Sequence, residues 1–317
     1  MSRVYASLPL SGPQGQPGRE VLRGAELALE RAEGPLPELV VLDSFGDDHG
    51  QRAVANARRA AEDPQALAFL GDFLSSRVLE TAPIVGEAGL LVVAPVATFA
   101  GLSGPTLVRL MPHDGVGARA IAVWLAEQGV EELLVVHDHD ADYGVSVGAM
   151  CVDAAREGGL RVRSRPVWNH DEPVAADVGD AGAVLYVGVA GSGAADMWRD
   201  LHAAAPNAWL LGTEGVAEPW LGRRLDPRTA ERTRFFLAQR APMGFYGFEA
   251  MALILDAIEE GGPDRAAVAR AARATRDRDS VLGRYSLDED GHTTSTAYGR
   301  LAVADGELVW DHATPAA

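Results

Sequence analysis

The sequence predicts an α/β protein built from two lobes, each a doubly wound parallel sheet. Short apolar runs alternate with helical patterns in the first third of the 317 residues, and the same alternation restarts near residue 132. Alternation of this kind makes the strands parallel and places helices over both faces of the sheet. The length suffices for two domains of ordinary size, so each series predicts one lobe.

The first lobe is expected to open with a strand–helix series. Strands are predicted where apolar residues run without interruption, at 4–8, 39–42, 67–70 and 90–93. The first helix between them shows apolar residues on one face, at i, i+4, i+7, i+8 and i+11 from Val21. Two further helices are predicted at 51–62, ending before Pro64, and at 76–88, ending at Gly89.

The uncharged segment 89–108 is long enough to cross a bilayer. However, Pro95 and Pro105, together with three glycines, interrupt it. We therefore expect a strand, a turn and a second strand here, and no membrane span.

The second lobe repeats the pattern after a boundary expected at 111–117. Its strands are predicted at 132–138, 160–164, 183–188 and 208–212, and its helices at 145–157 and 194–204. Two more helices are predicted at 248–260 and 264–275. The tail alternates as strands do, with turn signals at Asp290-Gly291 and Asp305-Gly306.

Composition narrows the class of protein. Apolar residues make up 47% and charged residues 23%, which is typical of a globular chain. The net charge of −17 repels phosphate backbones, so we expect no nucleic-acid partner. Every residue of the Lys+Arg count is arginine, which removes any Schiff-base lysine, and Cys151 is the only cysteine, which removes a disulfide framework.

A glycine-rich segment follows the first strand and resembles a phosphate-binding loop. Its glycines, Gly12, Gly15 and Gly18, are spaced G-x-x-G-x-x-G and interrupted by Pro13 and Pro17. A dinucleotide loop requires G-x-G-x-x-G, and a Walker loop requires a lysine. We therefore expect these residues to turn the chain sharply out of the first strand and to bind no nucleotide cofactor.

Two other patterns suggest enzyme chemistry. "GVSVG" around Ser146 matches the nucleophile elbow of hydrolases, but Ser146 falls inside a predicted helix and not directly after a strand. The cluster 137–142 contains two histidines and three aspartates, and 47–50 contains a similar acidic turn. Such clusters are more often solvated acids at a strand end than metal ligands, so no metal is expected.

Hydroxyl groups follow two adjacent strands of the first lobe. Ser75 and Ser76 come after the strand at 67–70, and Thr98 comes after the next strand. Hydroxyls and the N–H groups of a helix N-terminus suit a carboxylate. Each residue alone is more often a simple helix cap, and it is their recurrence at adjacent strand ends that favours a carboxylate site. Glu214 follows a strand of the second lobe, where it either caps a turn or meets an ammonium group.

Eight segments in order resemble the solute-binding proteins of branched-chain amino acid ABC transporters, the Leu/Ile/Val-binding type of periplasmic binding protein. They are "LPLSG" with "GAELALE", "GDFLSS" with "AP", "APVAT", "RLMPHDG", "DYG", "GTEGV", "YGFEAMALILDAI" and "LGRYSLDEDG". The resemblance covers nearly the whole chain. It implies a type I Venus-flytrap fold with three crossovers, lobe 1 at 1–113 and 243–290, lobe 2 at 114–242 and 291–317, and a ligand between them.

The resemblance also implies roles for particular residues. Ser75 and Thr98 would hold the ligand carboxylate, Glu214 would hold its ammonium group, and Tyr143 would contact the ligand from lobe 2. The remaining expected ligand contacts are Phe73, Ser76, Val96, Ala97, Ala190, Gly191, Tyr246 and Pro17. Many relatives have an aromatic residue where this chain has Pro17 or Ala190-Gly191, so we expect a wider or differently shaped pocket.

The expected function is reversible, non-catalytic capture of an amino acid or related small carboxylate. The resemblance implies a membrane ABC permease as partner, no cofactor, a monomer, and an extracytoplasmic location after removal of a signal segment. Two alternatives stay open on the sequence. The same fold can serve as the ligand-sensing domain of a regulator, and Ser146 could serve a hydrolase.

Overall fold

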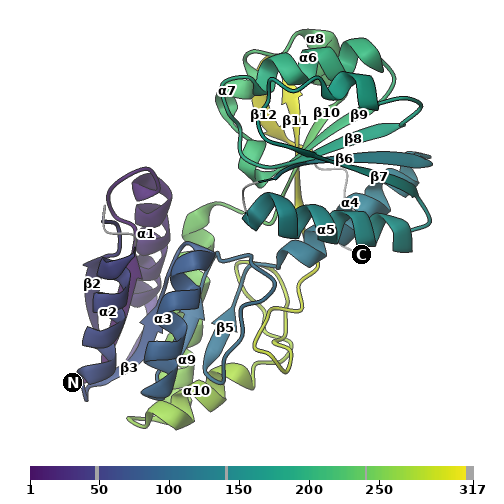
Figure 1. Ribbon diagram of the computed structural model, residues 1–317. Coiled ribbons are helices and arrows are strands. Elements are labelled where there is room, and N and C mark those ends of the chain that lie inside the picture. The colour runs from purple at the N-terminus through teal and green to yellow at the C-terminus, as the bar shows by residue number, and fades with distance from the viewer. Residues whose placement is uncertain (47–49, 140–141, 240, 312–317) are drawn as a thin grey trace. The chain divides into compact units, whose positions relative to one another are not determined.

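The computed structural model describes residues 1–46, 50–139, 142–239 and 241–311, which form two compact units (Figure 1). Unit 1 comprises Met1–His113 and Ala241–Ser295, and unit 2 comprises Asp114–Arg240 and Thr296–Ala317. The chain therefore passes between the units three times. These boundaries differ from the expected ones by two residues at 241–242 and by five at 291–295.

Unit 1 contains a five-stranded, fully parallel sheet in the order β2-β1-β3-β4-β5. Its strands are β1 (Arg3–Leu8), β2 (Glu38–Asp43), β3 (Ala66–Leu70), β4 (Leu91–Ala94) and β5 (Leu107–Arg109). Its helices are α1 (Gly15–Arg31), α2 (Gln51–Glu62), α3 (Ser75–Glu87), α9 (Met243–Gly261) and α10 (Arg265–Arg273). Helices α2 and α3 lie over one face, and α1 and α9 lie over the other (Figure 1).

Helices α1 and α9 approach each other through glycines. A Cβ atom added to Gly24 would lie 1.8 Å from the carbonyl oxygen of Gly244, and one added to Gly247 would lie 1.8 Å from that of Val21. Only residues without a Cβ atom allow backbones to come this close. The two helices, far apart in sequence, thus form one tightly packed layer.

The glycine-rich segment after β1 differs from its expected form. Gly15, Pro17 and Gly18 lie inside the first turns of α1, and of the three loop glycines only Gly12 has a positive φ, of 71°. A Cβ atom on Gly18 would lie 1.9 Å from the carbonyl oxygen of Pro9. The expectation of a sharp turn made by all these residues was therefore wrong, because Gly18 instead lets α1 begin against the end of the strand.

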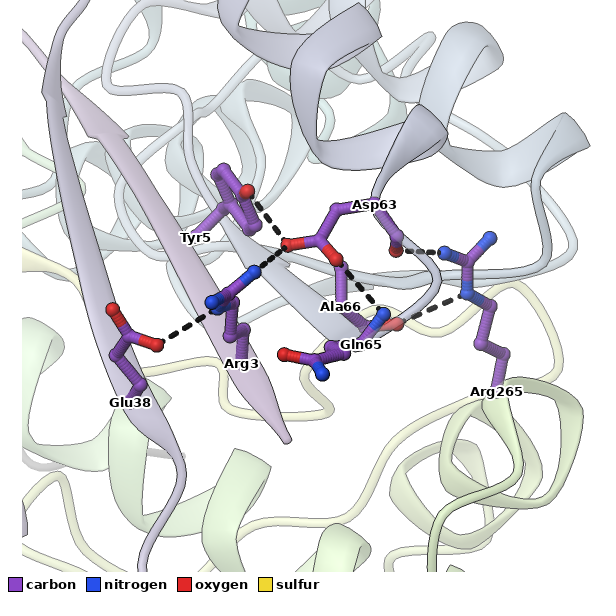
Figure 2. Close-up of polar contacts among 7 residues, drawn as sticks. All are labelled: Arg3, Tyr5, Glu38, Asp63, Gln65, Ala66 and Arg265. Carbon is purple, nitrogen blue, oxygen red and sulfur yellow. Dashed lines mark hydrogen bonds and ion pairs between the residues drawn. The ribbon is translucent and has the colours of Figure 1, made fainter. Parts of the chain in front are cut away.

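The amino ends of the unit 1 strands are tied together by charged side chains (Figure 2). Asp63, just after α2, accepts hydrogen bonds from Arg3 (3.0 Å) and from the Tyr5 hydroxyl (2.8 Å), and Arg3 also pairs with Glu38. The Arg265 guanidinium at the start of α10 donates to four backbone carbonyls, those of Ala61, Asp63, Ala66 and Ala88. These contacts fix the edge opposite to the carboxyl ends of the strands.

Unit 2 contains a seven-stranded sheet in the order β12-β11-β10-β9-β8-β6-β7. The parallel strands are β6 (Glu132–Asp138), β7 (Arg161–Val167), β8 (Ala183–Val187), β9 (Trp209–Thr213) and β10 (Thr233–Leu237). The tail adds two antiparallel strands at the edge, β11 (Gly299–Ala304) and β12 (Glu307–Trp310). They are joined by the expected Asp305-Gly306 turn, in which both residues have positive φ.

Alternate residues along the unit 2 strands supply two cores. Leu133 and Val135 of β6 pack with α4 (Asp114–Glu127) and α5 (Asp142–Glu157). Leu134 and Val136 pack on the opposite face with α6 (Ala194–Ala204). The shorter elements on this unit are η1 (Val174–Asp177), η2 (Glu214–Val216), α7 (Pro219–Gly222) and α8 (Pro227–Glu231).

The predicted fold class is confirmed, and most predicted elements lie within a few residues of the observed ones. Helix α4 and strand β10 were not predicted. The uncharged segment forms β4 and β5 with a connection between them, as expected. In the described part of the chain, no helix combines the length and hydrophobicity that crossing a bilayer requires.

Candidate functional site

The carboxyl ends of β3 and β4 bring Ser75 and Thr98 together in unit 1. Ser75 is the first residue of α3, and its Oγ accepts the backbone N–H groups of Thr98 and Phe99, each at 3.1 Å. Because Oγ acts as acceptor in both bonds, the Ser75 hydroxyl keeps its own hydrogen to donate to a ligand oxygen. Ser76, exposed in the same first turn, belongs to the same helix N-terminus.

The residues around Ser75 and Thr98 differ in exposure, and therefore in which of their groups a ligand could contact. Val96 and Ala97 follow β4 after Pro95 and are 6% and 1% exposed, so they can serve a ligand through backbone groups only. Thr98 is 8% exposed, and Phe73 is half-buried between β3 and α3. We call the segments 73–76 and 96–99 the carboxylate edge.

A buried arginine anchors the loop that follows the carboxylate edge. Arg109, at 0% exposure, donates to the Phe99 carbonyl at 2.6 Å and lies 2.8 Å from Nδ1 of His292. The other imidazole nitrogen, Nε2, lies 2.8 Å from the Leu102 carbonyl, which assigns it the proton. Burial, followed by the charge of Arg109, lowers the pKa of His292. The neutral ring thus connects 99–102 to 288–293.

In unit 2, Glu214 and Tyr143 lie near each other at the carboxyl ends of the strands. Glu214 begins η2 directly after β9, and Tyr143 lies in the first turn of α5. A Cβ atom on Gly215 would lie 3.5 Å from Cε1 of Tyr143, so the aromatic ring rests on this turn. Burial raises the pKa of Tyr143 well above its usual value, and the negative charges of Glu214 and Asp114 add to the effect.

Sequence reasoning missed Tyr298 as a member of this group. Burial, then the charges of Glu214 and Asp114, raise the pKa of Tyr298 as well. Its hydroxyl lies 2.4 Å from the position that a Cβ atom on Gly117 of α4 would take. Tyr298 comes from the tail just before β11, and nothing in the local sequence connects it to Glu214.

The loop 188–193 is fixed beside the Glu214 turn. The Ala190 N–H donates to the Gly215 carbonyl at 3.0 Å, and the Val189 N–H donates to Asp138 at 3.1 Å. The other Asp138 oxygen accepts the hydroxyl of Tyr186. Ala190 and Gly191, which the sequence singled out, therefore sit next to Glu214.

A histidine occupies the space beside Gly191. A Cβ atom on Gly191 would lie 2.8 Å from Nδ1 of His170, whose ring centroid is 5.2 Å from that of Tyr186. Burial lowers the pKa of His170 and favours the neutral ring. Position 191 thus has no room for a larger side chain while His170 stands there, which gives a physical reason for the missing aromatic residue.

All of the expected ligand contacts stay predictions, Pro17 and Tyr246 among them. Pro17 lies in the first turn of α1, half-exposed, and Tyr246 lies in α9 at 2% exposure. Neither position is joined to the carboxylate edge by the contacts described above.

The enzyme-like patterns take ordinary structural forms. Ser146 lies within α5, and its Oγ donates to the Tyr143 carbonyl at 3.4 Å, as helical serines commonly do. The elbow geometry that a hydrolase requires is therefore not present at Ser146. The clusters at 47–50 and 137–142 fall partly outside the described residues. Among those described, no three His, Cys, Asp or Glu side chains gather as a metal site would require.

Comparison with known proteins places the chain in a family. Residues 6–204 match the family model described as periplasmic binding protein. The chain belongs to this family. The relative and the two structures described below are named as binding proteins, and not as enzymes.

A curated relative covers almost the whole chain. The "Leu/Ile/Val-binding protein homolog 3" of Brucella melitensis is 28% identical, over 97% of this chain and 94% of its own length.

Two solved structures share the fold at lower identity. An ABC transporter substrate-binding protein of Desulfitobacterium hafniense, solved with Leu, has a TM-score of 0.79 at 18% identity, covering 98% of this chain and 99% of its own. A solute-binding protein of an R. palustris ABC transporter, solved with benzoate, has a TM-score of 0.72 at 17% identity, covering 97% and 94%.

Proposed function

We propose that this protein is the solute-binding component of an ABC transporter and captures an amino acid or a related small carboxylate. Ser75 and Thr98, helped by backbone groups near Val96 and Ser76, receive the ligand carboxylate in unit 1. Glu214, flanked by Tyr143, receives its ammonium group in unit 2. One ligand engaging both groups would hold the two units together, and release would follow their separation.

The geometry of Ser75 carries this proposal. A carboxylate that leaves water loses several kcal/mol of hydration unless donors replace it. The carboxylate edge supplies a hydroxyl hydrogen at Ser75 and the N-terminus of a 13-residue helix, both suited to an anion. Glu214 supplies the opposite charge that a zwitterion needs.

The side-chain pocket is proposed to differ from that of a leucine binder. Small residues stand at 190 and 191, and His170 lies behind Gly191. The relatives of this fold include one solved with Leu and one solved with benzoate, so the fold accepts carboxylates of different shape. A ligand broader than leucine is consistent with a pocket that lacks an aromatic wall at 190–191.

The biological setting forms part of the proposal. The curated relative and the two structures above are binding proteins, and both structures belong to ABC transporters by name. We infer a membrane permease as partner, an extracytoplasmic location and a monomeric state for this chain as well.

The test compares two ligand classes on one variant. A thermal-shift screen of amino acids, amides and aromatic acids first identifies binders. Calorimetry then compares wild type with Glu214→Ala, which should weaken amino acid binding at least tenfold more than binding of a simple carboxylate. Glu218→Ala, an exposed acid four residues along the same segment, should change neither. Equal loss for both ligand classes would exclude the ammonium role of Glu214.

A further inference from the structure

A buried carboxyl group directly precedes the first segment of the carboxylate edge in the chain. Asp72 follows Gly71 at the end of β3 and is 1% exposed. Its Oδ1 accepts the backbone N–H of Phe73 at 2.5 Å and the Ser44 hydroxyl at 3.2 Å. Its Oδ2 is buried, and among the described residues it has no hydrogen-bond partner.

The surroundings of Asp72 supply little charge compensation. Arg77 of α3 acts on it electrostatically, but Arg77 also pairs with Glu80 at 3.1 Å. Asp43, at the end of β2, is held by the N–H groups of Leu10 and Phe45. Burial dominates, and it raises the pKa of Asp72 to about 6 in spite of the hydrogen bonds to Oδ1.

The backbone connects Asp72 to the ligand-binding groups. Asp72 holds the Phe73 N–H, and two residues later Ser75 holds the Thr98 and Phe99 N–H groups. Three residues span at most about 11 Å of extended chain, so the Cα atoms of Asp72 and Ser75 lie within about 11 Å of each other. An anion bound at Ser75 would therefore place a second negative charge near the buried Asp72 carboxylate, which favours protonation of that carboxylate.

We propose that Asp72 is a positioning residue for the carboxylate edge and takes up a proton when an anionic group binds at Ser75. The proton comes from solvent and resides on Oδ2, the oxygen that accepts no hydrogen bond. Oδ1 keeps its bonds to Phe73 and Ser44, so the edge retains its shape while the charge on Asp72 disappears. This inference rests on the proposed function.

The expected size follows from Coulomb's law. Charges about 10 Å apart at an effective dielectric constant of about 20 repel enough to change affinity roughly tenfold. Affinity for a carboxylate should therefore fall about tenfold from pH 5 to pH 8. Between those limits, near pH 6.5, binding should take up about half a proton per ligand.

Calorimetry of the full chain tests this with L-leucine and benzoate as probes. Wild type is titrated from pH 5 to 8 in phosphate and in Bis-Tris, whose ionisation enthalpies differ, so proton uptake is measured without any variant. Asp72→Asn keeps the shape of the side chain and should abolish both the uptake and the pH dependence. Glu87→Gln, an exposed acid at the last residue of α3, should preserve both.

The outcomes separate this inference from the proposed function. Binding with proton uptake that disappears in D72N supports the inference. Binding without uptake in wild type, or uptake unchanged in D72N, overturns the inference alone. Failure of both probes, and of every amino acid, amide and aromatic acid of the thermal-shift screen, to bind at any pH contradicts the proposed function and overturns the inference with it.

Discussion

Replacing Gly24 by alanine should destabilise unit 1 even though alanine is the better helix former. Gly24 lies inside α1, where alanine favours the helix by about 1 kcal/mol over glycine. The added carbon would lie 1.8 Å from the Gly244 carbonyl oxygen and 2.8 Å from the backbone nitrogen of Phe248. Both atoms belong to the backbone of α9, so neither can rotate away, and the two helices must move apart.

The size of the effect follows from the contact distances. Atoms in ordinary contact lie roughly 3.5 Å apart, so the helices must separate by about 1.5 Å at Gly24. Gly247 makes a second close approach to Val21, so separating the helices loosens contacts along the whole interface between α1 and α9. Overpacking of this kind costs about 3 kcal/mol or somewhat more. After subtraction of the gain in helix propensity, Gly24→Ala should lose about 2–3 kcal/mol.

Urea unfolding followed by far-ultraviolet circular dichroism measures this loss, with the transitions of the two units fitted separately. Gly86→Ala is the matched control, since Gly86 also lies within a helix of unit 1 and its nearest atom is the Thr106 hydroxyl oxygen at 3.3 Å. That variant should be unchanged or up to about 1 kcal/mol more stable. A G24A protein as stable as wild type would refute the close approach of the helices. Equal losses in both variants would show that packing at Gly24 is not the cause.

Three further results are expected. Ser75→Ala removes the acceptor of two backbone N–H groups and should cost about 1–2 kcal/mol of stability together with at least tenfold in carboxylate affinity, measured by thermal unfolding and calorimetry. Burial and Arg109 lower the pKa of His292, so the unfolded state binds a proton at this residue more readily than the folded state does. The contribution of His292 to the free energy of unfolding is therefore complete above about pH 6.5 and should be lost as the pH falls toward the folded pKa. His292→Gln should flatten that part of the curve of stability against pH. Arg265→Ala leaves several backbone carbonyls without their hydrogen-bond donor and should lower the free energy of unfolding by about 2–4 kcal/mol. Arg23→Ala removes an exposed ion-pair partner and should change the urea midpoint little.

The fold could be predicted where local pattern and tertiary environment agree. The helix at 51–62 has its observed bounds because its alanines recur on one face and Pro64 limits it. Helix α4 was missed because "DGVGARAIAVWLAE" is apolar around most of its circumference and shows no clear face. Strand β10, "TRFFL", is short and carries an arginine, so a pattern of five residues could not distinguish it from a loop.

The candidate site could be predicted only where its residues follow strand ends. Ser75 and Thr98 lie after adjacent parallel strands, and the sheet brings them together as expected. The position of His170 beside Gly191 depends on the tertiary packing of a loop, which leaves no periodic signal. Asp72 follows a glycine and is indistinguishable in sequence from a solvated loop acid. Its burial is produced by tertiary structure, because Ser44 and the start of α3 enclose it only in the folded chain.

The division of unit 1 into two stretches of chain fixes the order in which a ribosome can complete it. Strands β1–β5 are synthesised first, and α9 follows only after all of Asp114–Arg240 has been made. Until then, the surface of α1 around Val21 and the sheet face beneath α9 remain open to water. A nascent chain that ends before Met243 therefore presents apolar surface that the finished protein buries, and this is the stage at which a holding chaperone has most to bind. A circular permutation that places α9 ahead of β1 would remove that interval.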